Sequence, residues 1–308
     1  MPAFPALDSL IENFRNRRPI RAGSLIITIY GDAIAPRGGT VWLGSLINLL
    51  EPLGLNQRLV RTSVFRLAKE NWLAADQVGR RSYYSLTGPG IRRFQKAFTR
   101  VYAEHNPDWD GRWLMTIFNL LSPDDRTKLR QELEWLGFGV LSPTVMLHPQ
   151  MKKAELVTIL QELDYLDDVI ILEDMSEGIS TSRPLRLQSR ESWNLPKLAE
   201  SYRCFLEKFR PIWAHIKDNG TPTPEQCFQI RTLLIHEYRR IILRDPQLPD
   251  ELLPGDWAGS SARQLCYNIY QRVWRSAEEH LDNTLETAEG PLPPPNSKFY
   301  SRYGGLKL

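Results

Sequence analysis

A chain of 308 residues and 35.6 kDa is long enough for two or three domains that each bury a hydrophobic core. Its 42% hydrophobic and 24% charged residues are typical of a soluble globular protein and exclude a disordered chain. The formal net charge is only +3, so a surface that binds nucleic acid would have to be a local basic patch.

The cysteines and the N-terminus indicate the compartment. Cys204, Cys227 and Cys266 are odd in number and form no CxxC pair, which argues against a disulfide framework or a zinc site. The first residues, MPAFPALDSLIENFRNRRPI, lack the charged-then-apolar order of a signal peptide, and the run 25-LIITIY-30 is too short to span a bilayer. We therefore expect a cytoplasmic protein with reduced core thiols and no membrane association.

Residues 1–22 are interpreted as an N-terminal arm. Its basic run, 15-RNRRPIR-21, is either a DNA-reaching arm or an unpaired solvated segment, and the second alternative is favoured.

Residues 23–103 have the element order of a winged helix-turn-helix. The turn 36-PRGGT-40 stops the first helix, because Pro and two Gly cannot continue it, and the side-chain oxygen of Asn56 caps the third. The expected elements are helices over 24–34, 41–50 and 56–72, strands around 73–75 and 82–86, and a helix over 90–102.

The third helix, 56-NQRLVRTSVFRLAKENW-72, divides into two faces at about 100° per residue. One face is apolar and would lie on the core. The other lies inside an arc of about 140° and has no acidic residue, whereas a merely solvated face usually mixes charges of both signs. This outer face consists of Arg58, Arg61, Thr62, Phe65, Arg66 and Lys69.

In a winged helix-turn-helix the third helix enters the major groove, where arginine can hydrogen-bond guanine and an apolar group can contact the thymine methyl. We expect Arg58, Arg61 and Thr62 at base edges or flanking phosphates, and Arg66 and Lys69 at phosphates. The hairpin tip 76-DQVGRR-81 would bring Arg80 and Arg81 to a phosphate or the minor groove. Phe65 either meets a thymine methyl or packs under the wing.

Residues 110–180 change to alternating strands and helices. Ser122 is expected to cap a helix in which Pro123 takes the first position and two aspartates follow in the first turn. The expected order is a strand over 112–120, that helix up to Gly137, an extended segment over 140–147, a helix over 153–163 and a strand over 169–175. This pattern predicts most of a ferredoxin-like α+β domain.

The remainder is predicted to be a helical C-terminal domain, 189–288, with helices over 194–217, 224–243 and 261–288. The last residues, 289-EGPLPPPNSKFYSRYGGLKL-308, are rich in Pro and Gly and have no apolar period, so we expect a mobile tail.

Three stretches of the chain resemble the PaaX family, the repressors of phenylacetic acid degradation operons. They are 23-GSLIITIYGDAIAPRGGTVWLGSLI-47, 56-NQRLVRTSVFRLAKENWL-73 and, the most distinctive, 235-IHEYRRIILRDPQLPDELLPGDWAG-259. The resemblance runs from about Gly23 to about residue 285. It implies an N-terminal winged-helix DNA-binding domain, a central domain similar to the Cas2 fold and a C-terminal helical domain. It also implies that a dimer binds an inverted-repeat operator and releases it when phenylacetyl-CoA, rather than phenylacetate, binds.

The candidate effector site lies in the last of these stretches. An acyl-CoA has phosphates that need Arg or Lys and a ring that needs apolar or aromatic walls, although domain packing would use the same residues. Glu237 falls within the apolar stripe of its helix, so it is either a structural salt bridge to an arginine of another helix, which we favour, or a polar group lining the pocket. The candidates are His236, Glu237, Tyr238, Arg239, Arg240 and Trp257.

An enzyme is the alternative function. The run 236-HEYRR-240 lacks the second histidine of HExxH, with Arg240 in its place. Cas2-like folds can be metal-dependent nucleases that use an acid at the end of the first strand, but here that strand ends at Asn119-Leu120. Asp124 and Asp125, in the following helix, already serve its dipole. We therefore expect no catalytic residue, metal or cofactor, and keep an acyl-CoA-handling or nuclease enzyme as the alternative.

Overall fold

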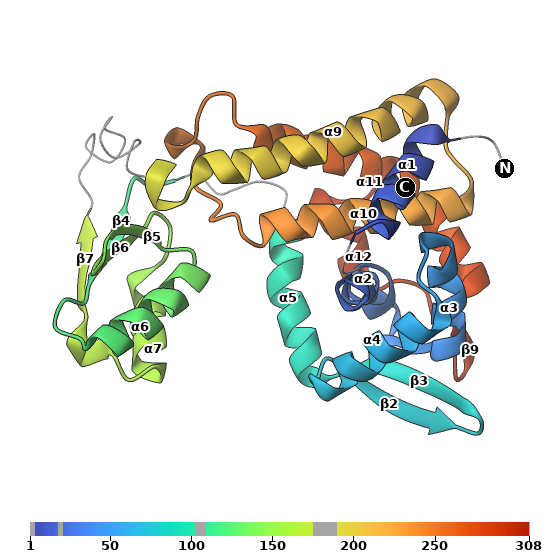
Figure 1. Cartoon of the computed structure of the whole chain (residues 1–308), viewed down its shortest axis with the longest axis horizontal. Coiled ribbons are helices and arrows are strands. Elements are labelled where there is room, and N and C mark those ends of the chain that lie inside the picture. Colours follow the sequence, from blue (N-terminus) through green and yellow to red (C-terminus); the bar gives the residue numbers. More distant parts are fainter. Residues whose placement is uncertain (1–3, 18–20, 103–108, 175–189, 308) are drawn as a thin grey trace. The chain divides into compact units, whose positions relative to one another are not determined.

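A computed structural model describes residues 4–17, 21–102, 109–174 and 190–307 (Figure 1). Its contacts divide the chain into two compact units. Unit 1 comprises residues 1–104, 203–243 and 260–308, and unit 2 comprises 105–202 and 244–259. By contacts, therefore, most of the C-terminal helical region belongs with the N-terminal helices.

Unit 1 begins with a helix, α1 (Pro5–Arg15). Leu7, Leu10, Ile11 and Phe14 are spaced by three or four residues and are all buried. The interpretation of residues 1–22 as an arm is therefore wrong for 5–15, because this apolar stripe docks the segment on the core. At the start of the basic run, Arg15 donates to the Pro52 carbonyl and Arg17 is ion-paired, so these two side chains are not unpaired; residues 18–20 of the run lie outside the described residues.

The next segment contains the predicted three helices and hairpin, with one extra strand. The helix predicted over 41–50 begins only at Leu43, because Thr40–Trp42 pairs as a strand with the second strand of the hairpin. All pairs in this sheet are antiparallel, in the order β1-β3-β2. The elements are α2 (Ala22–Ile29), the π-helical turn η1 (Tyr30–Ile34), η2 (Ala35–Arg37), β1 (Thr40–Trp42), α3 (Leu43–Leu50), η3 (Glu51–Leu53), α4 (Gln57–Lys69), β2 (Leu73–Val78), β3 (Arg81–Leu86) and α5 (Gly88–Tyr102).

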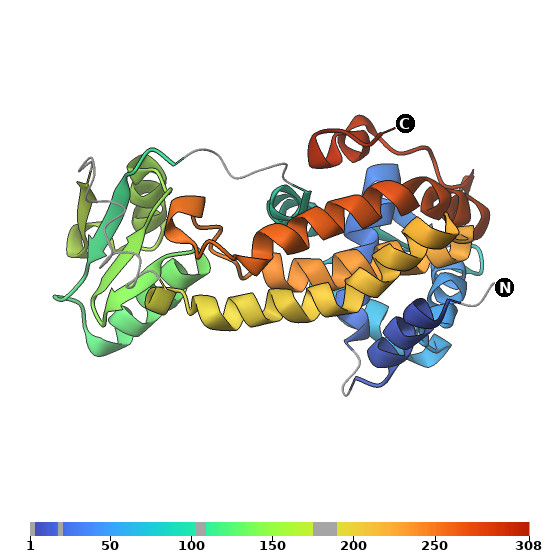
Figure 2. The same cartoon turned by 90° about the horizontal axis from the view of Figure 1, so that it is seen from above.

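Three long helices follow: α9 (Leu195–Asn219), α10 (Pro224–Ile242) and α11 (Ala258–Thr284). The part of α9 from Arg203 onward lies beside α10 and α11 in both views (Figures 1 and 2). A capping box between Thr223 and Gln226 starts α10, which is buried on all sides from Gln226 to Tyr238. Across the described residues, no helix has the length and apolarity needed to cross a membrane.

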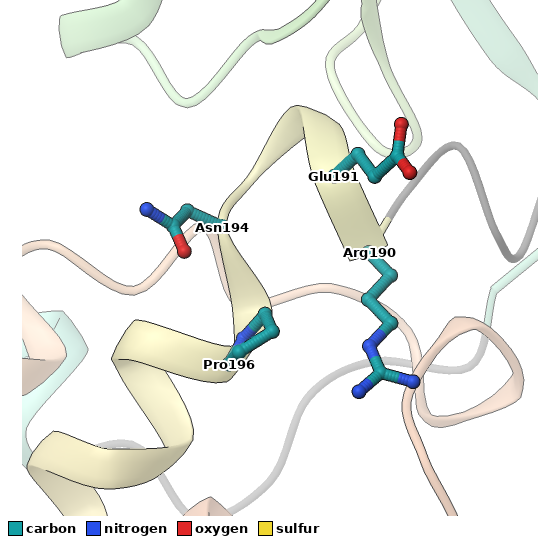
Figure 3. Close-up of a pocket in the computed structure, with 4 residues that line it drawn as sticks. All are labelled: Arg190, Glu191, Asn194 and Pro196. Atoms are coloured by element: carbon teal, nitrogen blue, oxygen red, sulfur yellow. The ribbon is translucent and has the colours of Figure 1, made fainter.

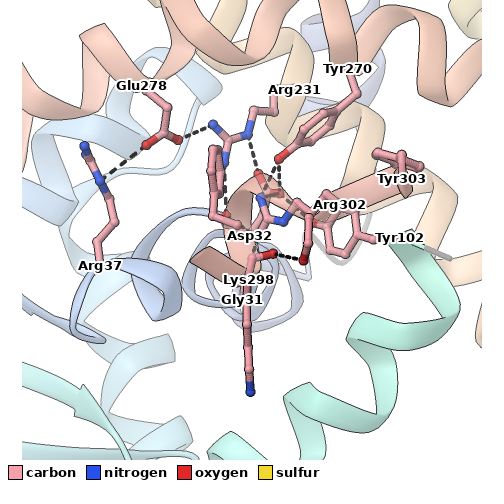
Figure 4. Close-up of polar contacts among 12 residues, drawn as sticks. Gly31, Asp32, Arg37, Tyr102, Arg231, Tyr270, Glu278, Lys298, Arg302 and Tyr303 are labelled. Atoms are coloured by element: carbon pink, nitrogen blue, oxygen red, sulfur yellow. Dashed lines mark hydrogen bonds and ion pairs between the residues drawn. The ribbon is translucent and has the colours of Figure 1, made fainter. Parts of the chain in front are cut away.

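The end of the chain packs onto unit 1. It contains β8 (Glu286–Thr287), β9 (Gly290–Pro291), α12 (Ser297–Tyr300) and η6 (Arg302–Gly304). Phe299 and Arg302 are each only 1% exposed, and the Arg302 guanidinium donates to the carboxylate of Asp32 at 3.0 Å (Figure 4). The expectation of a mobile tail over 289–308 is therefore wrong for residues 289–307, because a buried ion pair and a buried ring hold this segment.

Unit 2 is built around a four-stranded antiparallel sheet in the order β5-β6-β4-β7. The segment predicted as one extended piece over 140–147 is two strands, which gives the complete β-α-β-β-α-β order of a ferredoxin-like domain. Its elements are β4 (Trp113–Ile117), α6 (Pro123–Trp135), β5 (Gly139–Ser142), β6 (Val145–His148), α7 (Lys153–Glu162), η4 (Leu166–Asp168) and β7 (Ile170–Asp174). Cys204, Cys227 and Cys266 form no disulfide, and the last two are buried.

Candidate nucleic-acid interface

Helix α4 presents the two predicted faces. Asn56 caps it as expected, since its side-chain oxygen accepts from the Leu59 backbone N–H at 2.9 Å. Val60, Val64 and Leu67 are buried on the inner face. All six outer-face residues are exposed: Arg58, Arg61, Thr62, Phe65, Arg66 and Lys69.

Phe65 lies in the middle of this exposed face. It is 59% exposed, and the Lys69 ammonium lies 5.0 Å from the centre of its ring. The alternative in which Phe65 packs under the wing is therefore wrong. The neighbouring Arg66 pairs with Glu70 at 3.7 Å, but an exposed pair of this kind is worth at most about 1 kcal/mol, so a phosphate can replace the carboxylate.

The two arginines at the tip of the β2–β3 hairpin differ in their surroundings. Arg80 is exposed in the turn between β2 and β3. Arg81 stacks 4.1 Å from the centre of a Trp42 ring and pairs at 2.8 Å with Glu286, which follows α11. Arg81 is thus held against the sheet by its own chain, a difference that the hairpin sequence does not reveal.

The basic charge of the chain is concentrated in this region. Residues 57–102 contain ten arginines and lysines against two acids, a charge of +8, whereas the whole chain has +3. This excess includes Arg92 and Arg93 at the start of α5, which were not among the predicted DNA-binding residues. Figure 1 shows that end of α5 beside α4 and β2. The sequence could have pointed to these two arginines, because α5 contains no acidic residue.

Glu237, a candidate for the effector site, has a structural role in α10. Arg17 donates two hydrogen bonds to its carboxylate, at 2.6 and 2.9 Å, and Lys208 lies at 3.1 Å. Burial by itself would raise the pKa of Glu237, but Arg17 and Lys208 lower it to about 2. The structure thus contains a buried salt bridge at Glu237, as the favoured interpretation expected, but its arginine follows α1 instead of lying within another helix.

Two further candidates, His236 and Arg239, connect α10 to α2. The His236 Nδ1 and the Thr28 hydroxyl are 3.0 Å apart, and Arg239 donates to the same hydroxyl at 2.9 Å. Burial lowers the pKa of His236 to about 3, so the ring is neutral at physiological pH. Tyr238 is buried with its ring in contact with that of Phe205, and the Arg240 guanidinium lies 3.5 Å from the Glu237 carboxylate. Trp257 belongs to unit 2, where its ring contacts that of Tyr202.

A cavity of about 520 Å³ lies in unit 2, lined by Arg190, Glu191, Asn194 and Pro196 (Figure 3). None of the candidate effector residues lines it. Among its described lining residues, Arg190 is accompanied by the anionic Glu191, which does not match the several phosphates of an acyl-CoA. The position of the effector site therefore stays a prediction from the sequence.

One of the two acids considered for a nuclease site, Asp125, makes only local contacts. Ser122 and Lys128 donate hydrogen bonds to Asp125 and hold the pKa of its carboxyl below the ordinary value. Ser122 also caps α6, as expected. Within the described part of the chain, no three His, Cys, Asp or Glu side chains are grouped so that they would hold a metal ion.

Comparison with known protein families gives three matches that together cover most of the chain. Residues 21–90 match the model of a PaaX-like protein, 106–185 that of the PaaX protein central Cas2-like domain, and 193–283 that of the PaaX-like protein C-terminal domain. The chain belongs to the PaaX family. The protein named Transcriptional repressor PaaX of Escherichia coli strain K12 is 43% identical over 303 residues, which are 98% of this chain and 96% of that protein.

A solved structure shares the fold. The uncharacterized protein Rv0674 from Mycobacterium tuberculosis superposes with a TM-score of 0.53, covering 84% of this chain and 96% of that one. At 21% identity this likeness concerns the fold alone.

Proposed function

We propose that this chain is a transcriptional repressor that binds operator DNA with the outer face of α4. The observation that carries the proposal is the exposed outer face of that helix, whose six residues carry four positive charges and no negative one, in the segment that holds the basic charge of the chain. The PaaX family membership and the E. coli relative named as a transcriptional repressor support it.

In this proposal α2, α3, α4 and the sheet β1-β3-β2 are a winged helix-turn-helix, with α4 as the recognition helix and the β2–β3 hairpin as the wing. Arg58, Arg61 and Thr62, in the first half of α4, contact bases or flanking phosphates. Phe65 faces a thymine methyl. Arg66, Lys69 and Arg80 contact phosphates, whereas Arg81 positions the wing through Trp42 and Glu286.

The protein acts in the cytoplasm and regulates the genes of a phenylacetate catabolic operon. Phenylacetyl-CoA is the effector that releases the DNA. The effector acts by binding the DNA-free conformation better than the DNA-bound one. A hundredfold loss of operator affinity requires a coupling free energy of about 2.7 kcal/mol. The operator is an inverted repeat, because a twofold-symmetric dimer presents two copies of α4.

A gel-shift titration on the promoter region of the chain's own operon tests both parts. Phenylacetyl-CoA, phenylacetate and free CoA are compared, and only the first is expected to release the DNA. Release by none of the three would remove the effector from the proposal but leave the repressor. Equal affinity for the promoter and for random DNA at the same salt concentration would refute the repressor itself.

A further inference from the structure

The start of α5 is fastened to the end of α4. The Thr87 hydroxyl donates to the Asn71 carbonyl at 2.7 Å and accepts from the Gly90 N–H at 3.0 Å. A side chain at Gly90 would not fit, because its Cβ would lie 2.5 Å from the Trp72 carbonyl oxygen. The two helix ends therefore form one rigid corner.

Two arginines project from this corner. The Arg93 guanidinium lies 4.8 Å from the centre of a Trp72 ring and donates to the Glu70 carbonyl at 3.4 Å, beside the end of α4. Arg92 is exposed, and the described residues give it no acidic partner. Since α5 has no acidic residue, its arginines add to the partial positive charge at its N-terminal end.

The length of α4 places this corner outside the groove that the helix would occupy. Its 13 residues extend about 20 Å at about 1.5 Å per residue, whereas the major groove is about 12 Å wide. When α4 enters the groove by its N-terminal half and at an angle to the direction of the groove, its C-terminal end passes over the sugar-phosphate backbone that borders the groove. The corner with Arg92 and Arg93 follows directly after that end of α4.

We propose that Arg92 and Arg93 form a second contact with the DNA backbone, on the phosphates that border the groove occupied by α4. This inference rests on the proposed function. A rigid corner suits this contact, because stacking on Trp72 holds the Arg93 side chain before DNA arrives, so less side-chain entropy is lost on binding. The contact is independent of sequence, since it involves phosphates alone.

The test is the salt dependence of DNA affinity for Arg92→Gln, measured by fluorescence anisotropy on an operator duplex and a random duplex of equal length. One lost phosphate contact lowers the salt slope by about 0.9 and weakens binding roughly eightfold at 0.1 M salt. We expect the same loss on both duplexes, and near-normal slope and affinity for Arg92→Lys, which keeps the charge. Arg93→Gln is compared with Arg93→Lys in the same way. Both changes remove the guanidinium that stacks on Trp72, but only Arg93→Gln removes the charge.

Arg272→Gln is the matched control, because it removes the same charge from an exposed position of α11 in the same unit. It should leave the slope unchanged. An Arg92→Gln variant with unaltered slope and affinity, in a protein whose wild type binds the operator specifically, would overturn this inference alone. If the wild type itself fails to distinguish the operator, the proposed function falls instead.

Discussion

Asp32 is the centre of the buried polar cluster of unit 1 (Figure 4). Its carboxylate is 4% exposed and accepts hydrogen bonds from Arg231 Nε at 2.6 Å and Arg302 Nη1 at 3.0 Å. The hydroxyls of Tyr102 and Tyr270 donate to it at 2.5 and 3.0 Å. One carboxylate thus joins the turn after α2 to α10, α11 and the end of the chain.

The substitution Asp32→Asn keeps the shape of this side chain and removes its charge. Arg231 still pairs with Glu278, but for Arg302 no other carboxylate partner lies among the described residues. Removing one partner of a buried ion pair costs about 3–5 kcal/mol, because an uncompensated charge stays in the interior. This is a large part of the roughly 5–15 kcal/mol by which a folded protein is stable.

Differential scanning calorimetry measures the effect, since it resolves separate transitions if the two units unfold separately. For a unit of this size each kcal/mol shifts the midpoint by about 2–4 °C, so Asp32→Asn should lower it by roughly 6–20 °C. Asp218→Asn, an exposed change at the end of α9, is the control and should shift it little. A loss below about 2 °C for Asp32→Asn would refute the argument that this charge holds the cluster together.

The pH dependence of the stability provides a second test of the Asp32 carboxylate. Burial alone would raise the pKa of Asp32, but Arg231 and Arg302 lower it below the ordinary value of 3.8. Its contribution to stability is therefore complete above pH 3.8 and is lost as the pH falls through the lower folded value. Asp32→Asn should remove this part of the acid sensitivity.

Three more predictions concern single side chains. Arg61→Ala should weaken operator binding by about 1–3 kcal/mol with a smaller loss on random DNA, whereas equal losses would assign Arg61 to a phosphate. Arg80→Ala should lower the salt slope of DNA binding by about one unit. Arg81→Ala should lower it by less than half as much, because Arg81 pairs with Glu286. Anisotropy titrations that give the two variants the same slope would contradict this difference. The pKa of Glu237 is lowered from 4.5 to about 2, so up to about 3 kcal/mol of stability is present above pH 4.5 and lost as the pH falls toward 2. Urea unfolding at several pH values should show this loss in the wild type, and a Glu237→Gln protein with the same acid sensitivity would rule it out.

Structural features that depend on residues within one helical turn could be predicted from the sequence. The caps at Asn56 and Ser122 and the start of α10 after Thr223 depend on residues three positions apart, so they were legible in the chain itself. The two faces of α4 follow from periodicity in the same way. The stripe of α1 was equally available, but the basic run that follows it suggested an arm.

Features that depend on distant partners were not predictable. Arg302 stands between Ser and Tyr in a segment rich in Gly and Pro, and nothing near it indicates that its partner is Asp32, 270 positions earlier. Glu286 is 205 positions from Arg81, so Arg80 and Arg81 at the hairpin tip were predicted to have the same role. Val41 and Trp42 of β1 were assigned to a helix because they precede an apolar helix without a break.

The packing of α2 shows how a change in the C-terminal helices would reach α4 and its proposed DNA-binding face. All residues of α2 except Ser24 are buried, and the helix packs against α4 on one side and α10 on another. Thr28 of α2 is the hydroxyl shared by His236 and Arg239, while Asp32, one turn later, binds Arg231 of the same helix. Because a closely packed core transmits displacement rather than absorbing it, α10 cannot shift without moving α2 or breaking these bonds. We therefore expect an effector that displaces α10 to change the position of α4.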